Sequence, residues 1–395
     1  MPYLRALLGI AFFCAVAWAL SSHKRRFPWR VVLFGLSLQV GLGLLILKTE
    51  LGRRFFDGIA TFVQTLIART SPAAEMVFGD LAKADGTTGF IFAFASSGLI
   101  VIIFFSALMS VLYHLGIMQV IIWVLARVMS ATMGVSGAEA MAMAANVFVG
   151  QTEAPLVVKP YIPNMTMSEL NAMMTGGFAT IAGSVLAVYM GILGPEIGPH
   201  LLTASVMSAP AAFLVAKIMQ PEVEVSATAG AVPLKFERPA ANLVEAAANG
   251  TQDGLKLWLN VIAMLIAFIA LVALIDWPLE WLGATMGLEG GLSLGRIFGW
   301  VFAPVAWLMG VEGWHDSQLF GSLLGTKITI NEFVAFGRMQ ELIPSFENPR
   351  TAQMAAYALC GFANFGSVGI QIGGISPIAP NRKTDISRLA LRAML

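Results

Sequence analysis

A group of polar side chains interrupts one of the apolar stretches of the chain, at residues 146–155, where the sequence is NVFVGQTEAP. Amide side chains both donate and accept hydrogen bonds, and a carboxylate is a strong acceptor. In a membrane segment such groups are rare because an ionised carboxylate costs at least ~2.5–3.5 kcal/mol there, and those that occur usually bind a ligand or an ion. The polar residues of this stretch are Asn146, Gln151, Thr152 and Glu153.

A second carboxylate stands in a comparable place. Glu332 lies in the segment 331–335, NEFVA, after an uncharged stretch at 319–326. Two interpretations are open for each acid. It could form a salt bridge that joins two helices, or both acids could belong to one binding site. The bases that could form the salt bridges are Lys159, Lys327 and Arg338.

The chain that carries these acids has the composition of a membrane protein. Of its 395 residues, 57% are hydrophobic and only 12% are charged, whereas an average soluble domain is about 25% charged. A net charge of +1 gives no indication of a nucleic-acid partner. Uncharged runs long enough for a membrane span, which takes roughly 17–25 residues, recur along the chain at 6–22, 31–47, 86–125, 170–195, 197–216, 257–275 and 351–380.

Basic residues predict the orientation. A cluster at 24–30 follows the first apolar run instead of preceding it, so we interpret that run as a retained membrane helix and not as a signal peptide. By the positive-inside rule this loop is cytoplasmic, which places the N-terminus outside. A second basic cluster at 382–392 is expected to be cytoplasmic too.

The polar stretch has the features of a hairpin tip. Gly150 weakens a helix, and Pro155 lacks an N–H and pushes the preceding residue out of helical geometry. Segments 141–148 and 156–162 can therefore enter and leave the membrane as two half-helices, with Glu153 at the apex. The segment around Glu332 predicts a second hairpin of the same kind.

The two halves of the chain share a motif. The sequence 177–185, GFATIAGSV, is similar to 361–368, GFANFGSV, with one residue gapped, and each follows one of the two acids. We interpret this as an internal duplication. Gly-interrupted apolar segments in corresponding positions of two halves indicate broken helices, which expose backbone groups at a transporter binding site near the bilayer midplane.

These patterns together predict an all-α polytopic membrane protein with two repeats, two re-entrant helical hairpins and two broken transmembrane helices. The family resemblance described below implies the rest of the expected fold class, in which the repeats are inverted and form a scaffold and a transport domain. Residues 1–86 would form N-terminal membrane and interfacial helices, the latter at 52–57 and 71–86. The remaining segments are 87–219, the first repeat with a hairpin at about 136–163 and a broken helix at about 168–195; 220–249, a polar linker; and 250–395, a scaffold helix and the second repeat with a hairpin at about 313–344 and a broken helix at about 350–373.

Other residues suggest no separate chemistry. His315 and Asp316 have no partner at metal-ligand spacing. Glu169, three residues after Thr166, matches a helix capping box. No phosphate-binding loop is present in the sequence, so transport driven by nucleotide hydrolysis within this chain is unsupported.

In combination, the motifs NVFVGQTEAP, GGFATIAGSV, INEFVAF and CGFANFGS closely resemble those of the concentrative nucleoside transporter family. The resemblance runs over most of residues 87–388, and the two opening spans agree with the bacterial members. It implies a homotrimer in which each protomer carries its own site. It also implies an elevator mechanism, in which a moving domain carries the site past a fixed scaffold that would include 257–275.

The same resemblance implies roles for individual residues. The nucleobase would be bound by Gln151, Thr152, Glu153 and Val185, and the ribose by Glu332, Phe362, Asn364 and Ser367. The sodium site of the family matches Asn146, Val149, Thr180 and Ile181. Sodium is thus the expected coupling ion, and no organic cofactor is expected. An amide, a hydroxyl and main-chain carbonyls form an oxygen cage, and hard cations prefer such oxygen ligands.

Two departures from the family stand out. Gly366 occupies a place where serine is common, which would loosen ribose contacts or ease the helix break. Family members also continue with a further membrane span after the segment that matches 381–392. Either the full-length protein extends beyond Leu395, which we expect, or it lacks that last span.

The expected function is therefore sodium-coupled uptake of a uridine-like nucleoside across the bacterial inner membrane. The protein is expected to contact membrane lipid and to have no enzymatic activity. One alternative keeps the substrate and uses a proton, carried by Glu153 or Glu332, as the coupling ion. A remote alternative is an intramembrane glycosyl-cleaving enzyme with the two acids as its acid and base. A passive channel is the last alternative.

Overall fold

The structure is a computed structural model that describes residues 2–79, 99–194, 196–230, 240–288 and 291–395. All regular secondary structure in these ranges is helical. The first half contains α1 (Pro2–Ala19), α2 (Trp29–Lys48), α3 (Glu50–Phe78), α5 (Val101–His114), α6 (Ile117–Met133), α7 (Gly137–Asn146), α8 (Ala154–Val157), η2 (Ile162–Asn164), α9 (Met167–Ala179), α10 (Gly183–Leu193) and α11 (Gly198–Met219). The second half contains α12 (Leu243–Thr285), α13 (Leu294–Met309), α14 (Trp314–Thr329), α15 (Glu332–Leu342), η3 (Ile343–Ser345), α16 (Pro349–Leu359), α17 (Phe365–Ile375), η4 (Pro380–Arg382) and α18 (Lys383–Met394).

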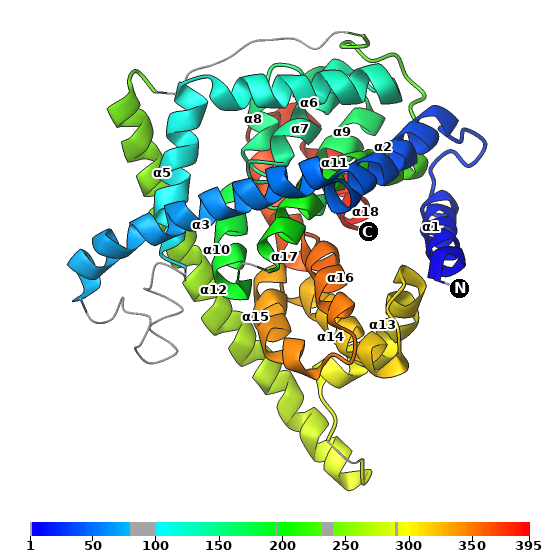
Figure 1. The fold of residues 1–395 in the computed structure, drawn as a ribbon. Coiled ribbons are helices and arrows are strands. Elements are labelled where there is room, and N and C mark those ends of the chain that lie inside the picture. The colour runs from blue at the N-terminus through cyan, green and yellow to red at the C-terminus, as the bar shows by residue number, and fades with distance from the viewer. Residues whose placement is uncertain (1, 80–98, 195, 231–239, 289–290) are drawn as a thin grey trace.

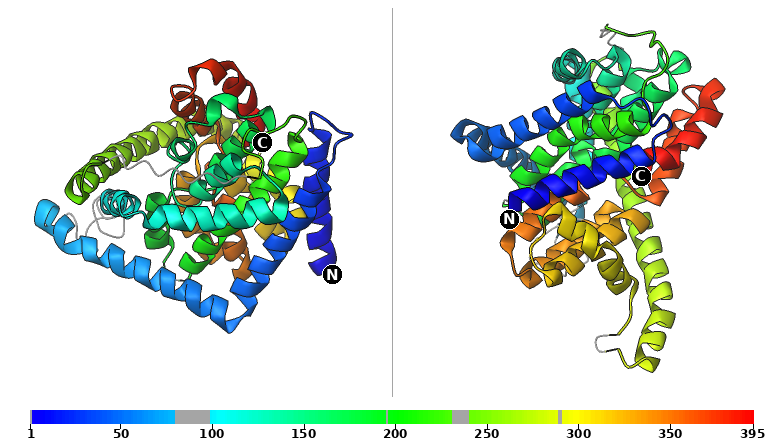
Figure 2. Two further views of the ribbon diagram at one scale, coloured as in Figure 1. Left: turned by 90° about the horizontal axis from the view of Figure 1, so that it is seen from above. Right: turned by 90° about the vertical axis from the view of Figure 1, so that its right-hand side faces the viewer.

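Several of these helices suit a membrane. Within the described ranges, four helical segments have the length and apolar composition to cross a bilayer, one of them being α9 and α10 taken together, or up to six if each of two bent helix pairs counts as one span. The bent pairs are α5 with α6, at 76°, and α13 with α14, at 110°. The long helix α12 reaches beyond the rest of the molecule (Figure 2, right), and only 11% of its most apolar window is buried.

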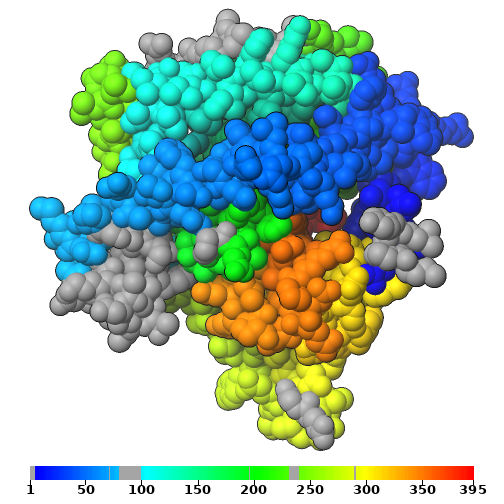
Figure 3. Space-filling view, viewed as in Figure 1, coloured from blue at the N-terminus to red at the C-terminus, as the bar shows by residue number. Residues whose placement is uncertain are grey.

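The helix α3 differs from the expectation for this region. Instead of two short interfacial helices at 52–57 and 71–86, one continuous helix of 29 residues covers 50–78, and residues 80–86 lie outside the described ranges. Thr49 begins the helix by accepting a hydrogen bond from the amide of Gly52. The helix crosses the face of the molecule between α6 and the α14–α16 region (Figures 1 and 3).

The two halves repeat the same order of elements, a hairpin followed by a broken helix. In the first half the hairpin is α7 with α8 and the broken helix is α9 with α10; in the second the corresponding pairs are α14 with α15 and α16 with α17. In Figure 1 the helices α7–α9 lie in the upper part of the molecule and α14–α16 in the lower part, with α10 and α17 between them. The predicted fold class is confirmed.

The two helix breaks contact each other. The first lies at 180–182 and the second at 360–364, and the amide of Phe362 donates to the carbonyl of Thr180 at 3.3 Å. Gly361 has a φ of +151°, and a Cβ atom there would lie 2.8 Å from the carbonyl oxygen of Phe178. Because only glycine tolerates both conditions, Gly361 is what allows the two breaks to approach this closely.

A carboxylate closes the base of each hairpin. In the second half Asp316, which is fully buried, accepts hydrogen bonds from the start of α16: the amides of Glu347 and Asn348 at 2.9 and 3.1 Å and the hydroxyl of Thr351 at 2.6 Å. In the first half Glu169 accepts from the hydroxyl of Ser136, at the start of α7, at 2.5 Å. Each hairpin is thereby fixed to the broken helix that follows it.

The region expected as a polar linker is partly structured. Residues 220–230 fold against the starts of α7 and α9, where Ser226 donates to Glu169 at 2.5 Å and the carbonyl of Thr228 accepts from the amide of Gly137 at 3.0 Å. Residues 231–239 lie outside the described ranges, and α12 already begins at Leu243. The prediction of a polar linker at 220–249 was incomplete. Hydroxyl groups such as those at 226 and 228 can face water, as in a linker, but they can also bind a buried carboxylate.

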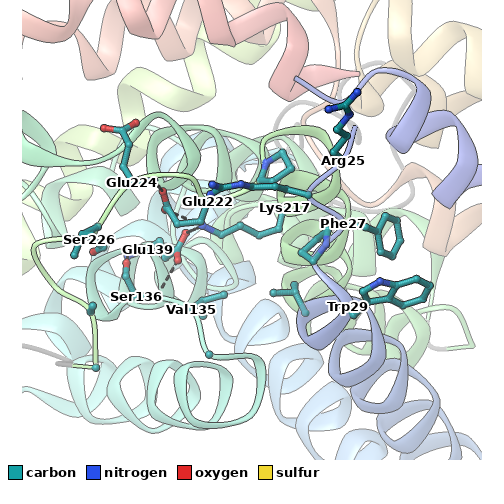
Figure 4. Close-up of a pocket in the computed structure, with 18 residues that line it drawn as sticks. Arg25, Phe27, Trp29, Val135, Ser136, Glu139, Lys217, Glu222, Glu224 and Ser226 are labelled. Carbon is teal, nitrogen blue, oxygen red and sulfur yellow. Dashed lines mark hydrogen bonds and ion pairs between the residues drawn. The ribbon is translucent and has the colours of Figure 1, made fainter. Parts of the chain in front are cut away.

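A buried ion pair lies beside this segment (Figure 4). The ammonium of Lys217, on α11, is 2.6 Å from Glu139 and 3.7 Å from Glu222. The side chains of Lys217 and Glu139 are 4% and 2% exposed. They line one end of a cavity of about 670 Å³ that the 25–31 segment also borders. This polar cluster lies at helix starts and ends, away from the helix breaks.

Candidate functional site

The tip of the second hairpin positions Glu332. The chain leaves α14 at Thr329, turns at Ile330 and Asn331, and enters α15 at Glu332. Asn331 caps α15 by accepting from the amide of Val334 at 2.9 Å. Glu332 therefore stands in the first turn of a helix, where the macrodipole favours a negative charge, and it is 6% exposed.

Glu332 is held by hydrogen bonds from both halves of the chain. The hydroxyl of Tyr189, on α10, donates to Oε1 at 3.0 Å, and Nδ2 of Asn364 donates to Oε2 at 3.2 Å. Asn364 is also the N-cap of α17, where its Oδ1 accepts from the amide of Ser367 at 2.8 Å. The structure thus brings Glu332, Asn364 and Ser367 together, with Phe362 half-buried two residues before Asn364.

Tyr189 is the site residue that the sequence did not predict. Its ring is fully buried and packs on Phe336 and Phe333, with ring centroids 4.4 and 5.5 Å away. Val185, predicted as an apolar wall, precedes it by one turn of α10 and is 5% exposed. Residues four apart share a helix face, but a tyrosine in an apolar run suits a hydrophobic core equally well, so its position one turn after Val185 did not identify it.

The alternative salt bridges of Glu332 are not formed. The ammonium of Lys327 donates instead to the carbonyl of Ala358 at 2.9 Å, and Arg338 donates to the hydroxyl of Thr326 at 3.1 Å. Among the described residues no base lies within ion-pair distance of Glu332. Its carboxylate is therefore satisfied by two neutral donors, which leaves acceptor capacity for a ligand.

The first hairpin presents Glu153 differently. Its carboxylate is exposed and folds back over Gly150, so that a Cβ atom at position 150 would collide with Oε2. Lys159 is exposed as well, and the described residues contain no ion pair of Glu153 with it. The two acids therefore differ in environment, one enclosed and one accessible.

The neighbours of Glu153 pack against the broken helices. Thr152 contacts Gly374 of α17, and a Cβ atom on Gly374 would collide with its methyl group. The Cβ of Gln151 lies 2.9 Å from the position that a Cβ of Gly177, on α9, would take. Gln151 is 7% exposed. The tip of the first hairpin is thereby held between α9 and α17.

The residues expected to hold sodium surround the first break. Thr180 donates its hydroxyl hydrogen to the carbonyl of Gly176 at 2.8 Å, which leaves its oxygen lone pairs free. The amide of Gly183 donates to the carbonyl of Phe148 at 2.9 Å and so fixes the hairpin tip, with Val149, beside the start of α10. Ile181, which is fully buried, lies within this break.

Asn146 provides a direct test of the fit to a cation. It is 1% exposed, and its Oδ1 is enclosed and has no hydrogen-bond partner. Leaving a buried polar atom unpaired costs about 1–3 kcal/mol, so a water or a cation at this oxygen would remove that cost. An unpaired amide oxygen, a hydroxyl oxygen and the carbonyl end of a half-helix form a donor set that fits Na⁺.

Family models cover nearly the whole chain. The model described as "Na+ dependent nucleoside transporter N-terminus" matches residues 8–81, "Nucleoside recognition" matches 95–196, and "Na+ dependent nucleoside transporter C-terminus" matches 200–395. This chain belongs to the concentrative nucleoside transporter family. It is accordingly a polytopic integral membrane protein and a transporter, not an enzyme.

Individual relatives agree with this membership. An uncharacterized transporter of Haemophilus influenzae is 43% identical over 100% of this chain and 94% of its own length. Solute carrier family 28 member 3 of Mus musculus is 43% identical over 98% of this chain, which spans 56% of that protein. The structure of CNTnw in an inward-facing substrate-bound state is similar at a TM-score of 0.91, with 39% identity, covering 100% of this chain and 94% of that one.

Proposed function

We propose that this protein is a symporter that takes nucleosides into the cell together with sodium. The observation that carries the proposal is the position of Glu332, whose carboxylate lies at a hairpin tip and accepts hydrogen bonds from Tyr189 of one half and Asn364 of the other. A site assembled from both halves at two helix breaks is the arrangement of secondary transporters.

The ribose fits the enclosed acid. A carboxylate accepts hydrogen bonds from two neighbouring hydroxyls, and Glu332 has acceptor capacity beyond its two protein donors. Asn364 and Ser367 would supply the complementary polar groups, and Phe362 an apolar surface for the sugar ring. Sodium/nucleoside cotransporter 1 of mouse and rat is also similar to this chain, which agrees with this substrate class.

The nucleobase would be bound by the first hairpin. Gln151, Thr152 and Glu153 offer donors and acceptors at one tip, and Val185 offers an apolar wall. An amide side chain suits this role because base edges present both kinds of hydrogen-bonding group. We propose a uridine-like substrate, held between the tip and the broken helices.

Sodium would bind at Asn146, Val149, Thr180 and Ile181 and supply positive charge to the first hairpin tip. The chain's own contribution is the enclosed oxygen of Asn146 and the hydroxyl of Thr180. An ion that orders this region raises the affinity for substrate, and by linkage the substrate raises the affinity for the ion equally.

We further propose a homotrimer that works as an elevator in a bacterial inner membrane, with the N-terminus outside. The mostly exposed apolar surface of α12 supports a scaffold role, because such a helix needs lipid or another copy of the chain to cover it. The basic residues between α1 and α2 support a cytoplasmic position for that loop.

Uptake into proteoliposomes tests the proposal. Radiolabelled uridine should accumulate above its external concentration when a sodium gradient is imposed, and it should remain chemically intact. Uptake that persists without sodium and depends on a pH gradient would establish the proton alternative. Equilibration without accumulation would indicate a channel, and release of free uracil would indicate an enzyme.

A further inference from the structure

A buried glutamine on α17 stands beside the site without an assigned role. Gln371 is fully buried. It follows Asn364 by seven residues and Ser367 by four, so the three share one face of the helix. That face runs from the enclosed acid Glu332, which contacts Asn364, to the tip of the first hairpin, where Gly374 meets Thr152.

Only one end of the Gln371 amide makes a hydrogen bond. Its Nε2 donates to the carbonyl of Met174, on α9, at 3.0 Å, and this contact determines which end of the amide is the nitrogen. Its Oε1 is enclosed and has no hydrogen-bond partner. An apolar side chain of similar size would avoid that unpaired oxygen, so the amide calls for an explanation beyond the bond to Met174.

Gln371 and Gln151 lie side by side. A Cβ atom on Gly177 would be 2.6 Å from Nε2 of Gln371 and 2.9 Å from Cβ of Gln151. The absence of a side chain at Gly177 is what admits both glutamines to the same space. Within the described part of the chain the Gln151 side chain makes no hydrogen bond, and its Oε1 is also enclosed and unpartnered.

We infer that Gln371 is a positioning residue that fixes the orientation of the Gln151 amide when a nucleoside binds, and thereby sets the preference among nucleobases. The inference rests on the proposed function. A rotation of the Gln151 side chain lets its amide nitrogen donate to Oε1 of Gln371. The oxygen of Gln151 then faces the substrate as an acceptor for an N–H group of the base.

Without Gln371 the orientation of Gln151 is not determined. An amide presents a donor at one end and an acceptor at the other, and only a fixed neighbour selects between them. Uridine and cytidine have the same sugar and bases of the same size. On one edge of the base, however, the donor of one nucleoside is replaced by an acceptor in the other. The relative uptake of these two nucleosides therefore measures the orientation of Gln151.

The test uses the full chain in proteoliposomes with uridine, cytidine and 2′-deoxyuridine as probes. Gln371→Met should change the ratio of the uridine and cytidine KM values by about fivefold or more, the size expected from one oriented hydrogen bond. The ratio for 2′-deoxyuridine and uridine should stay the same, because the ribose contacts are elsewhere. Gln371→Asn, which keeps the acceptor one methylene further away, should give an intermediate ratio.

A double substitution tests whether Gln371 acts through Gln151. If it does, Gln151→Met and the double variant Gln151→Met/Gln371→Met should show the same base ratio, because residues of one network are not additive. Additive changes would overturn the inference.

Gln119 provides a matched control. It is a buried glutamine on α6 whose Nε2 donates to the carbonyl of Tyr113 at 2.5 Å and whose Oε1 is also unpartnered. Gln119→Met should leave the base ratio unchanged. If Gln371→Met only lowers the thermal stability or the uptake of all nucleosides alike, the inference is wrong. If the unmodified protein shows no nucleoside uptake, the proposed function itself fails.

Discussion

The phenol of Tyr189 and the carboxylate of Glu332 come from opposite halves of the chain and meet at 3.0 Å in the protein interior. Tyr189→Phe removes this donor and leaves the ring packing on Phe336 in place. We expect a rise in KM for uridine of about tenfold, since hydrogen bonds to charged groups contribute roughly 1.5–3 kcal/mol. Uptake kinetics measure it, and an unchanged KM would show that Tyr189 serves packing alone.

Glu332→Gln should weaken nucleoside binding by at least about tenfold, because a neutral amide is a poorer acceptor for ribose hydroxyls than a carboxylate. Free nucleobases lack the sugar, so their weak competition should change little. Competition of uridine and uracil against labelled uridine measures both. Equal losses for the two compounds would contradict the ribose assignment of Glu332.

Thr180→Ala should raise the sodium concentration needed for half-maximal uptake, because it removes a hydroxyl oxygen from the proposed cation site. Thr180→Ser keeps the hydroxyl and should stay close to the unmodified protein. The measurement is initial uridine uptake as a function of sodium concentration. A curve for Thr180→Ala that coincides with the control would remove Thr180 from the site.

Gly361→Ala should strongly destabilise the protein. The backbone at Gly361 has a φ of +151°, and the new Cβ would lie 2.8 Å from a backbone oxygen, so the two helix breaks would have to separate. Gly369→Ala on α17 is the matched control, since nothing lies within 4 Å of its Cβ position. Thermal unfolding in detergent compares them, and equal midpoints would show that the breaks tolerate separation.

Lys217→Met should destabilise the protein by about 3–5 kcal/mol, because Glu139 would keep a buried charge without its partner. Adding Glu139→Gln should restore most of the loss, since the remaining groups are neutral. Unfolding midpoints of the two variants and the unmodified protein decide this. A double variant less stable than Lys217→Met alone would show that Glu139 is stabilised by other contacts.

The hairpins and broken helices could be predicted because their signals are local. Gly150 and Pro155 bracket the first tip, and α7 ends and α8 begins on either side of it. Repeated Gly-Phe-Ala motifs marked the breaks between α9 and α10 and between α16 and α17. Backbone preferences of glycine and proline act within a few residues, so a single sequence contains them.

Contacts between distant segments could not be predicted. A tyrosine in the apolar run of α10 suits a hydrophobic core, and only the packing of α10 on α15 brings its hydroxyl to Glu332. The contacts of Gln371 also depend on packing between distant segments, so its position in the sequence did not mark it as a residue of the site. Lys217 and Glu139 form an ion pair that spacing along the chain does not indicate. The separate environments of Glu153 and Glu332 also depend on three-dimensional packing.

The bond from the Phe362 amide to the Thr180 carbonyl has a mechanical consequence. Four half-helices meet at this one peptide contact, and Gly361 leaves no gap between them. The inner ends of α9, α10, α16 and α17 therefore cannot slip past one another without breaking it. Moving these ends apart would cost this hydrogen bond, about 1 kcal/mol, together with the close packing at Gly361.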